Sequence, residues 1–238
     1  MARWFPVARS AELVPRHVAQ TQLLGQEIAL WRSDDGGVNA WENRCPHRGV
    51  RLSIGFNTGA ELRCQYHGWR FAAGSGQCTF IPAHPAQKPA SGIRTGVYAA
   101  VERCHLVWMS LDPLADALDL PPLFETTQDR TLRCIFVNAP AEAVSDALAQ
   151  GYRIDATTTA PVTATDAFRL TTNTHPAGSP PAVTFLLQPV SDAQTVIHGM
   201  LQPDALTPDR VAVLRYHNAQ LSRVRDEVER RYTASRAS

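Results

Sequence analysis

Four residues of this chain have the side chains of metal ligands, at a spacing that supports redox chemistry. Cys45 and His47 form one pair, and Cys64 and His67 form a second pair further along the chain. Each pair offers one soft, anionic thiolate and one neutral imidazole within a short stretch of backbone. A [2Fe–2S] cluster in which one iron takes two thiolates and the other takes two imidazoles needs this combination. The pattern therefore predicts one such cluster on these four residues, and hence one-electron transfer.

Two glycines and the order of the ligands bear on the choice of metal. Gly49 and Gly68 stand where the loop backbone must turn closely around inorganic sulfide and leave N–H groups free to bond to it. Zinc is the alternative, because it also binds two cysteines with two histidines. Zinc fingers usually place both cysteines in one pair and both histidines in the other. The mixed pairs therefore favour the iron–sulfur cluster over zinc.

The segments around these ligands resemble a known family, the Rieske non-haem iron oxygenases. The ligand loops Cys45–Gly49 and Cys64–Trp69 look like those of ring-hydroxylating and demethylating members. The opening Trp4–Ala8 and the segment Leu30–Arg32 are similar to the alpha subunits of the branch typified by vanillate O-demethylase. The resemblance implies that Cys45, His47, Cys64 and His67 hold a Rieske cluster in the service of an oxidation reaction.

The resemblance also implies a second, mononuclear iron site, and here the sequence departs from the family. Family oxygenases hold this iron with two histidines and a carboxylate, in a helix of the form D-x₂-H-x₄-H with a distant aspartate as third ligand. Placing this motif on the helix expected over residues 141–152 puts its aspartate at Asp146 but its histidines at Ala149 and Ile154. Neither of these side chains binds metal. We therefore expect a shortened C-terminal domain without the iron triad, and no mononuclear iron.

Asp146 and three lone histidines are the remaining candidates in this half of the chain. In the family the corresponding aspartate lies between the Rieske histidine of one subunit and the iron of its neighbour, so the resemblance implies Asp146 as an inter-subunit electron-transfer bridge. An ordinary surface aspartate is the alternative. We expect His175 to be solvated in a turn, His198 to be hydrogen-bonded within a strand, and His217 to be partly exposed on the last helix.

Turn and strand signals divide the chain into two halves. Residues 1–111 indicate short strands separated by turns, which is an all-β pattern, and residues 112–130 are rich in Pro and Asp and indicate a linker. Residues 131–238 combine strands with a long final helix, for which Thr207 is the expected N-cap and Pro208 the first helical residue. The expected fold class is α+β: an N-terminal all-β Rieske domain, then a reduced oxygenase-like antiparallel sheet with a long C-terminal helix.

Apolar residues mark the face that this final helix should bury. They recur at mostly three- and four-residue spacing, which is the period of one face of a helix. The residues are Val211, Leu214, Leu221, Val224 and Val228. This pattern predicts a helix laid on the sheet.

Composition limits the kind of protein. With 238 residues, 44% of them hydrophobic, and a net charge of +1, the chain favours neither nucleic acid nor an anionic membrane as a partner. The N-terminus lacks the apolar segment of a secretory signal, and no apolar run reaches the roughly 18 residues of a membrane span, so we expect a cytoplasmic protein. Cys78, Cys104 and Cys134 are expected to be small buried residues rather than disulfides.

Three functions are compatible with these observations. The first is an electron-transfer subunit that passes electrons from a reductase or ferredoxin to a catalytic subunit of an aromatic hydroxylating or demethylating oxygenase. The resemblance then implies a hetero-oligomeric ring, a trimer or a multiple of one, with a homologous subunit that retains the iron triad. The second is a self-sufficient Rieske oxygenase with an atypical mononuclear iron site. The third is a non-catalytic redox-sensing or assembly protein. We expect the first function, an oxidoreductase component of an oxygenase system. Counting iron per chain distinguishes it best from the alternatives.

Overall fold

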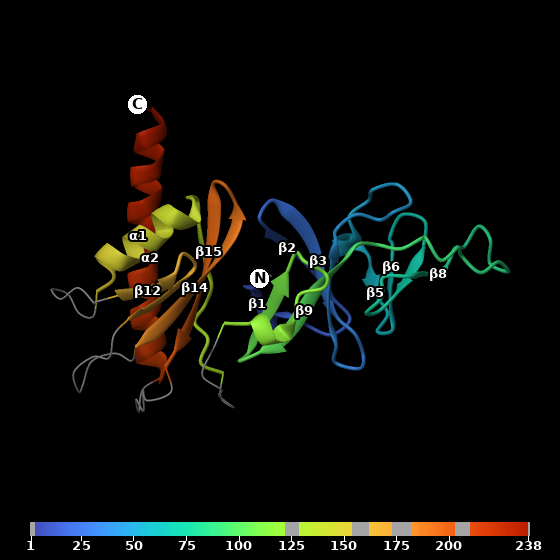
Figure 1. The fold of residues 1–238 in the computed structure, drawn as a ribbon, viewed down its shortest axis with the longest axis horizontal. Coiled ribbons are helices and arrows are strands. Elements are labelled where there is room, and N and C mark those ends of the chain that lie inside the picture. Colours follow the sequence, from blue (N-terminus) through green and yellow to red (C-terminus); the bar gives the residue numbers. More distant parts are fainter. Residues whose placement is uncertain (1–2, 122–128, 154–161, 173–181, 203–209, 238) are drawn as a thin grey trace. The chain divides into compact units, whose positions relative to one another are not determined.

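The structure is a computed structural model that describes residues 3–121, 129–153, 162–172, 182–202 and 210–237. The chain divides into two units, Met1–Pro122 and Leu123–Ser238, which are described separately here (Figure 1). The first unit is built from strands with short 3₁₀ turns, and the second from one sheet and two α-helices. The predicted α+β class, with a β-rich N-terminal part and a long C-terminal helix, is therefore confirmed.

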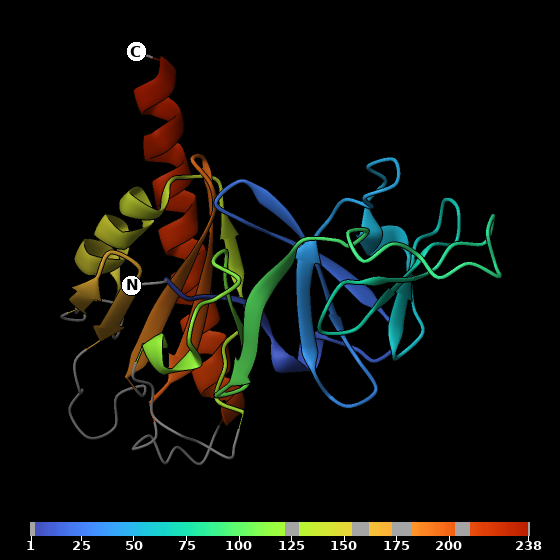
Figure 2. The same cartoon turned by 45° about the vertical axis from the view of Figure 1, so that its right-hand side comes forward.

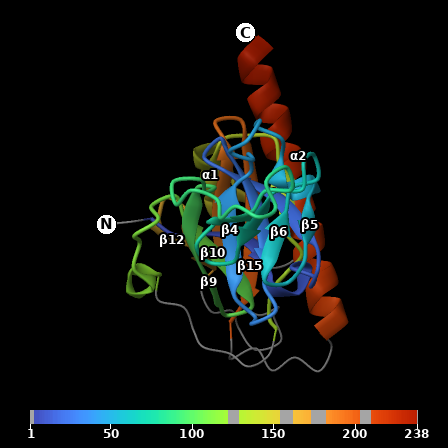
Figure 3. The same ribbon diagram turned by 90° about the vertical axis from the view of Figure 1, so that its right-hand side faces the viewer.

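Two antiparallel sheets make up the first unit. Six strands form the larger sheet in the order β1-β10-β9-β4-β3-β2, and four short strands form the smaller sheet in the order β5-β6-β7-β8. Figure 3 shows β5 and β6 of the smaller sheet side by side. The bounds are β1 Phe5–Arg9, β2 Val18–Leu23, β3 Gln26–Arg32, β4 Val38–Glu42, β5 Phe56–Asn57, β6 Glu61–Arg63, β7 Arg70–Ala72, β8 Cys78–Phe80, β9 Val97–Arg103 and β10 Leu106–Ser110.

Aromatic and aliphatic side chains fill the core between these strands. Trp31 on β3 and Trp41 on β4 are fully buried and meet edge to face, with ring centroids 5.0 Å apart. Leu62 and Phe71 come from the smaller sheet and join the same buried cluster as Cys45 and Cys64. Each buried side chain of this size contributes roughly 1.5 to 3 kcal/mol. The cluster therefore fixes the backbone on which both cysteines lie.

The hairpin between β9 and β10 carries avoidable strain. Cys104 and His105 have φ values of 53° and 60°, the left-handed conformation of a type I′ turn. A side chain with a Cβ costs about 1 kcal/mol there relative to glycine. We expect His105→Gly to stabilise the protein by about 1 kcal/mol, measured by thermal unfolding with circular dichroism.

The turn between β2 and β3 supplies the matched control for that change. Gly25 has φ +82° there, and no atom lies within 4 Å of the position that a Cβ would take. Gly25→Ala should therefore lower the stability by a similar amount through backbone strain alone, without a clash. Two variants that shift stability in the same direction would contradict this explanation.

The second unit is a five-stranded antiparallel sheet with two helices. The strand order is β11-β15-β14-β13-β12. Figures 1 and 2 show the two helices together against this sheet. Alternate residues of β14, namely Val183, Phe185 and Leu187, enter one buried cluster with apolar residues of both helices. The bounds are β11 Ile135–Val137, α1 Ala141–Gly151, β12 Val162–Asp166, β13 Arg169–Thr172, β14 Val183–Ser191, β15 Gln194–Leu201 and α2 Arg210–Ala237.

The long helix α2 buries a different face from the one predicted at its start. Val211 is 56% exposed, and Val213 is buried instead. His217 follows one turn later and is also buried, so the prediction that it is partly exposed was wrong. From Leu221 onward the predicted apolar positions are buried as expected. The expected cap residues at positions 207 and 208 lie outside the described residues.

Candidate iron–sulfur site

The first ligand loop leads from β4 to the 3₁₀ turn before β5. The N–H of Cys45 donates to the carbonyl of Val50 at 2.8 Å, and the N–H of Gly49 donates back to the carbonyl of Cys45 at 2.8 Å. These two bonds close a tight loop, with His47 and Arg48 at its tip. Gly49 has φ +71°, a conformation that glycine adopts at little cost.

The second ligand loop connects β6 to β7 and closes in the same way. The N–H of Cys64 donates to the carbonyl of Trp69 at 2.8 Å, and the N–H of Gly68 donates to the carbonyl of Cys64 at 3.1 Å. Gly68 has φ +69°, nearly the value at the equivalent glycine of the first loop. The two loops are thus structurally alike, although the histidine follows its cysteine by two residues in one and by three in the other.

The turns predicted at the two glycines, Gly49 and Gly68, are present, and their own N–H groups close the loops. At the tip of the first loop, the N–H groups of His47 and Arg48 donate to the Cys45 thiol. The sequence indicated where glycine was required, but it did not indicate which backbone N–H groups would donate to the Cys45 thiol.

The two cysteine side chains meet in the core. Cys45 and Cys64 are each 3% exposed, and their thiols are hydrogen-bonded to each other. Burial is the largest cause that raises the pKa of the Cys45 thiol, and the charge of the neighbouring Cys64 adds to it. The two backbone N–H donors lower this pKa, but the net result is a value of about 12. Buried thiolates are therefore unfavourable here without a cation, which an iron ion would supply.

The two histidine side chains meet at the surface. The ring centroids of His47 and His67 lie 4.8 Å apart. The ring of Trp69 stacks on that of His47, with a centroid distance of 4.4 Å and an interplanar angle of 8°. Tyr66, which is 59% exposed, packs against His67 at 3.8 Å. Burial, then the charges of His67 and Arg48, lower the pKa of His47. Lowering this pKa favours the neutral imidazole, which is the form that binds metal.

The arrangement fits the donor set of the predicted cluster. The four predicted ligands are brought together as a buried pair of thiols and an outward pair of imidazoles, which matches one iron with two sulfur ligands and one with two nitrogen ligands. The stacking of Trp69 on His47 was not predicted. An aromatic residue at the end of the second loop was its only signal in the sequence.

The candidates of the second unit that the structure describes form no common metal site. Asp146 lies on the exposed side of α1, and His198 is buried and hydrogen-bonded to Gln188 at 2.9 Å, as expected for a histidine within a strand. His175 lies outside the described residues. Across the described ranges, no group of three or more His, Cys, Asp or Glu side chains is placed to hold a metal ion.

A buried pair in the second unit was missed from the sequence. The hydroxyl of Tyr152, after α1, is hydrogen-bonded to Nδ1 of His217 on α2, and both residues are 1% exposed. Burial raises the pKa of Tyr152 well above its ordinary value. The pair links the end of α1 to α2 through a polar contact inside an apolar core.

The other cysteines mostly follow the expectation. All five cysteines lie in the described ranges, and none of them forms a disulfide. Cys78 and Cys104 are buried, whereas Cys134 is only half-buried. None of the helices in the described ranges is long and apolar enough to span a membrane.

Comparison with known proteins identifies the first unit. Residues 3–101 match the Rieske [2Fe-2S] domain family. The chain is 53% identical over 109 residues to Oxidoreductase NdmD of Pseudomonas putida, a match that covers 46% of this chain and 18% of NdmD. It is 41% identical over 125 residues to 4beta-methylsterol monooxygenase of Methylococcus capsulatus, covering 50% of this chain and 33% of that relative. The matches thus span no more than about a third of these curated relatives.

Solved structures share the fold over nearly the whole chain. Dicamba monooxygenase bound to 3,6 dichlorosalicylic acid gives a TM-score of 0.76 at 23% identity, covering 99% of this chain and 89% of that one. A QL mutant of NdmA of Pseudomonas putida with theobromine gives a TM-score of 0.73 at 19% identity, covering 95% of this chain and 80% of that one. At these identities the likeness shows the fold alone.

The family match assigns residues 3–101, which contain both ligand loops, to the Rieske [2Fe-2S] domain family. The predicted relationship to the Rieske oxygenases is confirmed by the relatives and by the shared fold. A Rieske domain is an electron-transfer module, and one relative, 34% identical over 122 residues, is the oxygenase subunit of 3-chlorobenzoate-3,4-dioxygenase of Comamonas testosteroni.

Proposed function

We propose that this chain is the Rieske electron-transfer subunit of an oxygenase system, with Cys45 and Cys64 on one iron and His47 and His67 on the other. A bound cluster of this type supplies one-electron chemistry. The observation that carries the proposal is the orientation of the ligands. The thiols are buried, whereas His67 is exposed and packs against the exposed ring of Tyr66. The imidazole side is therefore the side that partners reach.

Arginines around the ligand loops support a charged electron donor. Each lies within four residues of a proposed ligand along the chain; these are Arg44, Arg48, Arg51, Arg63 and Arg70, called here the arginine rim. Glu27 pairs with Arg44 and Arg51, and Glu61 lies 3.9 Å from Arg70. Five arginines against two carboxylates leave an excess of three positive charges. Such a surface attracts an acidic donor, a ferredoxin or the ferredoxin-like domain of a reductase.

The electron acceptor in this proposal is a homologous oxygenase subunit that retains an iron triad, within a hetero-oligomeric ring. Asp146 is proposed to lie at the junction between subunits, as the bridge between the Rieske histidines and the partner's iron. Its position on the exposed side of α1 leaves it available for that contact.

Turnover with and without the partner tests this proposal. With reductase and substrate, the chain alone should give only background product, whereas the mixture with a triad-bearing homologous subunit should turn over. Asp146→Ala should slow the mixture roughly tenfold or more. Glu142→Ala, an exposed carboxylate one turn earlier on α1, is the matched control and should have little effect.

Metal content decides between the proposal and its alternative. The purified chain should contain roughly two irons and two sulfides, with the rhombic EPR spectrum of a reduced Rieske centre. Iron near three per chain, together with turnover by the chain alone at the rate of the mixture, would replace the proposal with a self-sufficient oxygenase that has an atypical iron site.

A further inference from the structure

One face of the smaller sheet in the first unit carries two arginines in a row between two phenylalanines. Phe56 of β5 is paired in the antiparallel register with Arg63 of β6. Arg63 is paired in turn with Arg70 of β7, and Arg70 with Phe80 of β8. Directly paired residues place their side chains on the same face of a sheet. These four residues, called here the Phe–Arg–Arg–Phe row, therefore cross all four strands on one face.

This face of the sheet is open to solvent. Leu62 and Phe71, which follow and precede the two arginines on the other side of the pleat, are fully buried in the core. Arg63 and Arg70 are exposed, and Phe56 is 46% exposed. Aromatic residues and arginine are the side chains enriched at protein–protein interfaces. The composition of the row is therefore that of a docking surface.

Each arginine is held over the ring of its neighbouring phenylalanine. The guanidinium carbon of Arg63 lies 4.6 Å from the ring centroid of Phe56, and that of Arg70 lies 4.8 Å from the ring centroid of Phe80. Because the two phenylalanines are on the outer strands β5 and β8, the two guanidinium groups lean away from each other. Stacking on a ring also orders a long side chain before a partner arrives, which lowers the entropy lost on binding.

The positive charge of the row is only partly compensated. Like charges directly opposite each other destabilise a sheet, yet Arg63 and Arg70 form such a pair. Glu61 lies 3.9 Å from Arg70, and its carboxylate also accepts a hydrogen bond from the Thr79 hydroxyl at 2.6 Å. Among the residues that the structure describes, no carboxylate is ion-paired with Arg63. A partner that brings carboxylates would relieve the repulsion, so the row fits an acidic surface.

The row is connected directly to the second ligand loop. Strand β6 enters this loop, and Arg63 directly precedes Cys64. Strand β7 leaves it, and Arg70 directly follows Trp69. A partner bound to the row is therefore held close to the loop that carries His67.

We propose that the Phe–Arg–Arg–Phe row seats an acidic electron-donor protein on this chain. Carboxylates of the donor accept N–H groups from both arginines, and apolar side chains of the donor cover both rings. The inference rests on the proposed function and divides the arginine rim by role. The other arginines of the rim attract the donor from a distance, whereas the row holds it in contact.

Binding of an oxidised acidic [2Fe–2S] ferredoxin to the full chain with its cluster tests the inference, by surface plasmon resonance at low salt. The native chain should bind saturably. Arg63→Lys keeps the charge but loses the planar fork that stacks on Phe56 and matches a carboxylate. We expect its Kd to rise at least about tenfold through faster dissociation, with an association rate close to native. Arg94→Lys, the same replacement at an exposed arginine outside the rim, should change neither value.

A second variant separates the role of the ring from that of the charge. Phe56→Leu keeps an apolar side chain but removes the ring under Arg63, so it should also raise the Kd. Adding it to Arg63→Lys should weaken binding little further, because the two changes remove the same stacked arrangement. Losses that simply multiply would show that the ring does not act through Arg63.

The result can contradict the row without contradicting the proposed function. No saturable binding by the native chain, or equal Kd values for Arg63→Lys and Arg94→Lys, would overturn the inference. In those cases the chain would still show the EPR spectrum of a reduced Rieske centre and need its partner for turnover. Failure of the proposed function would instead appear as loss of that spectrum or as turnover by the chain alone.

Discussion

The double variant His47→Cys with His67→Cys is expected to lower the reduction potential of the cluster by at least about 250 mV. Rieske centres have potentials of roughly −150 to +300 mV, whereas clusters with four thiolates lie near −400 mV. The cause is charge: two neutral imidazoles are replaced by two anionic thiolates, which stabilise the oxidised form. His47→Cys alone should lower the potential or destroy the cluster.

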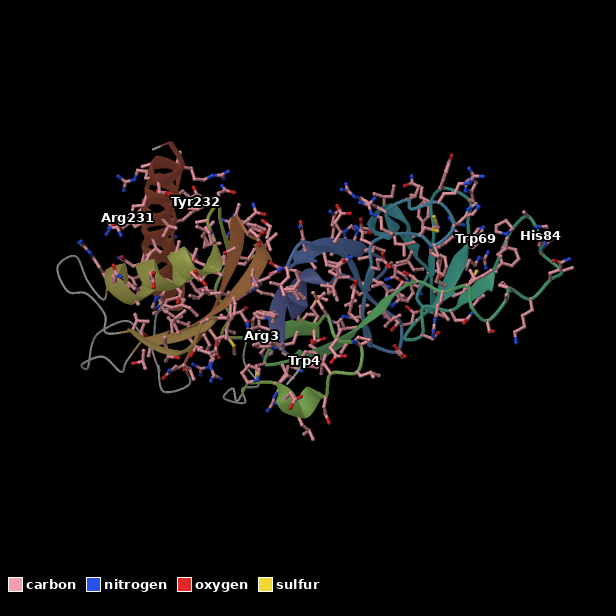
Figure 4. All side chains as sticks on the ribbon, turned by 45° about the horizontal axis from the view of Figure 1, so that its top comes forward. Arg3, Trp4, Trp69, His84, Arg231 and Tyr232 are labelled. Carbon is pink, nitrogen blue, oxygen red and sulfur yellow. The ribbon has the colours of Figure 1, made fainter. Side chains whose placement is uncertain are left out.

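Potentiometry followed by EPR measures this change. The structure supports survival of the cluster in the double variant, because the imidazoles lie at the surface and the core that fixes the loops contains the cysteines instead. His84→Cys makes the same replacement at an exposed histidine on the loop after β8 and should leave the potential unchanged; Figure 4 shows this residue beyond Trp69. An intact double-variant cluster with the native potential would show that the two histidines are not iron ligands.

Reversing one charge of the arginine rim is expected to slow electron donation by an acidic protein tenfold or more. Arg48→Glu puts a negative charge beside His47 at the tip of the first loop, where Arg48 already acts on the pKa of that histidine. Steering by complementary charge accelerates association by roughly 10- to 1,000-fold and is screened by salt. The native rate should therefore fall steeply with ionic strength, and the rate of the variant should fall much less.

Stopped-flow reduction by a pre-reduced acidic [2Fe–2S] ferredoxin measures this rate through the visible absorbance of the chain. Arg9→Glu makes the same change in net charge on β1, at the edge of the larger sheet, and should keep close to the native rate. A slow rate that persists at high salt in Arg48→Glu would indicate damage to the site rather than lost attraction. Equal rates in both variants would exclude the rim as the docking surface.

The sequence alone was sufficient to predict the ligand set. Thiolate and imidazole chemistry belongs to the side chains, and each ligand loop closes on itself through two backbone bonds within six residues. Gly49 and Gly68 permit those closures because they adopt positive φ at little cost. Local interactions of this kind depend on nothing distant, so the residues that we propose as iron ligands could be predicted from the linear sequence.

Only the tertiary structure decided which side of α2 is buried and which distant residues are in contact. Periodicity indicated the helix, yet Val211 is exposed and His217 buried, because packing against α1 and the sheet selects which side of the helix is covered. The hydroxyl of Tyr152 reaches His217 across 65 positions of the chain. Gln220 lines a groove only because the end of α1 lies opposite it. Such pairings arise from packing of whole elements, and the spacing of residues along the chain does not encode them.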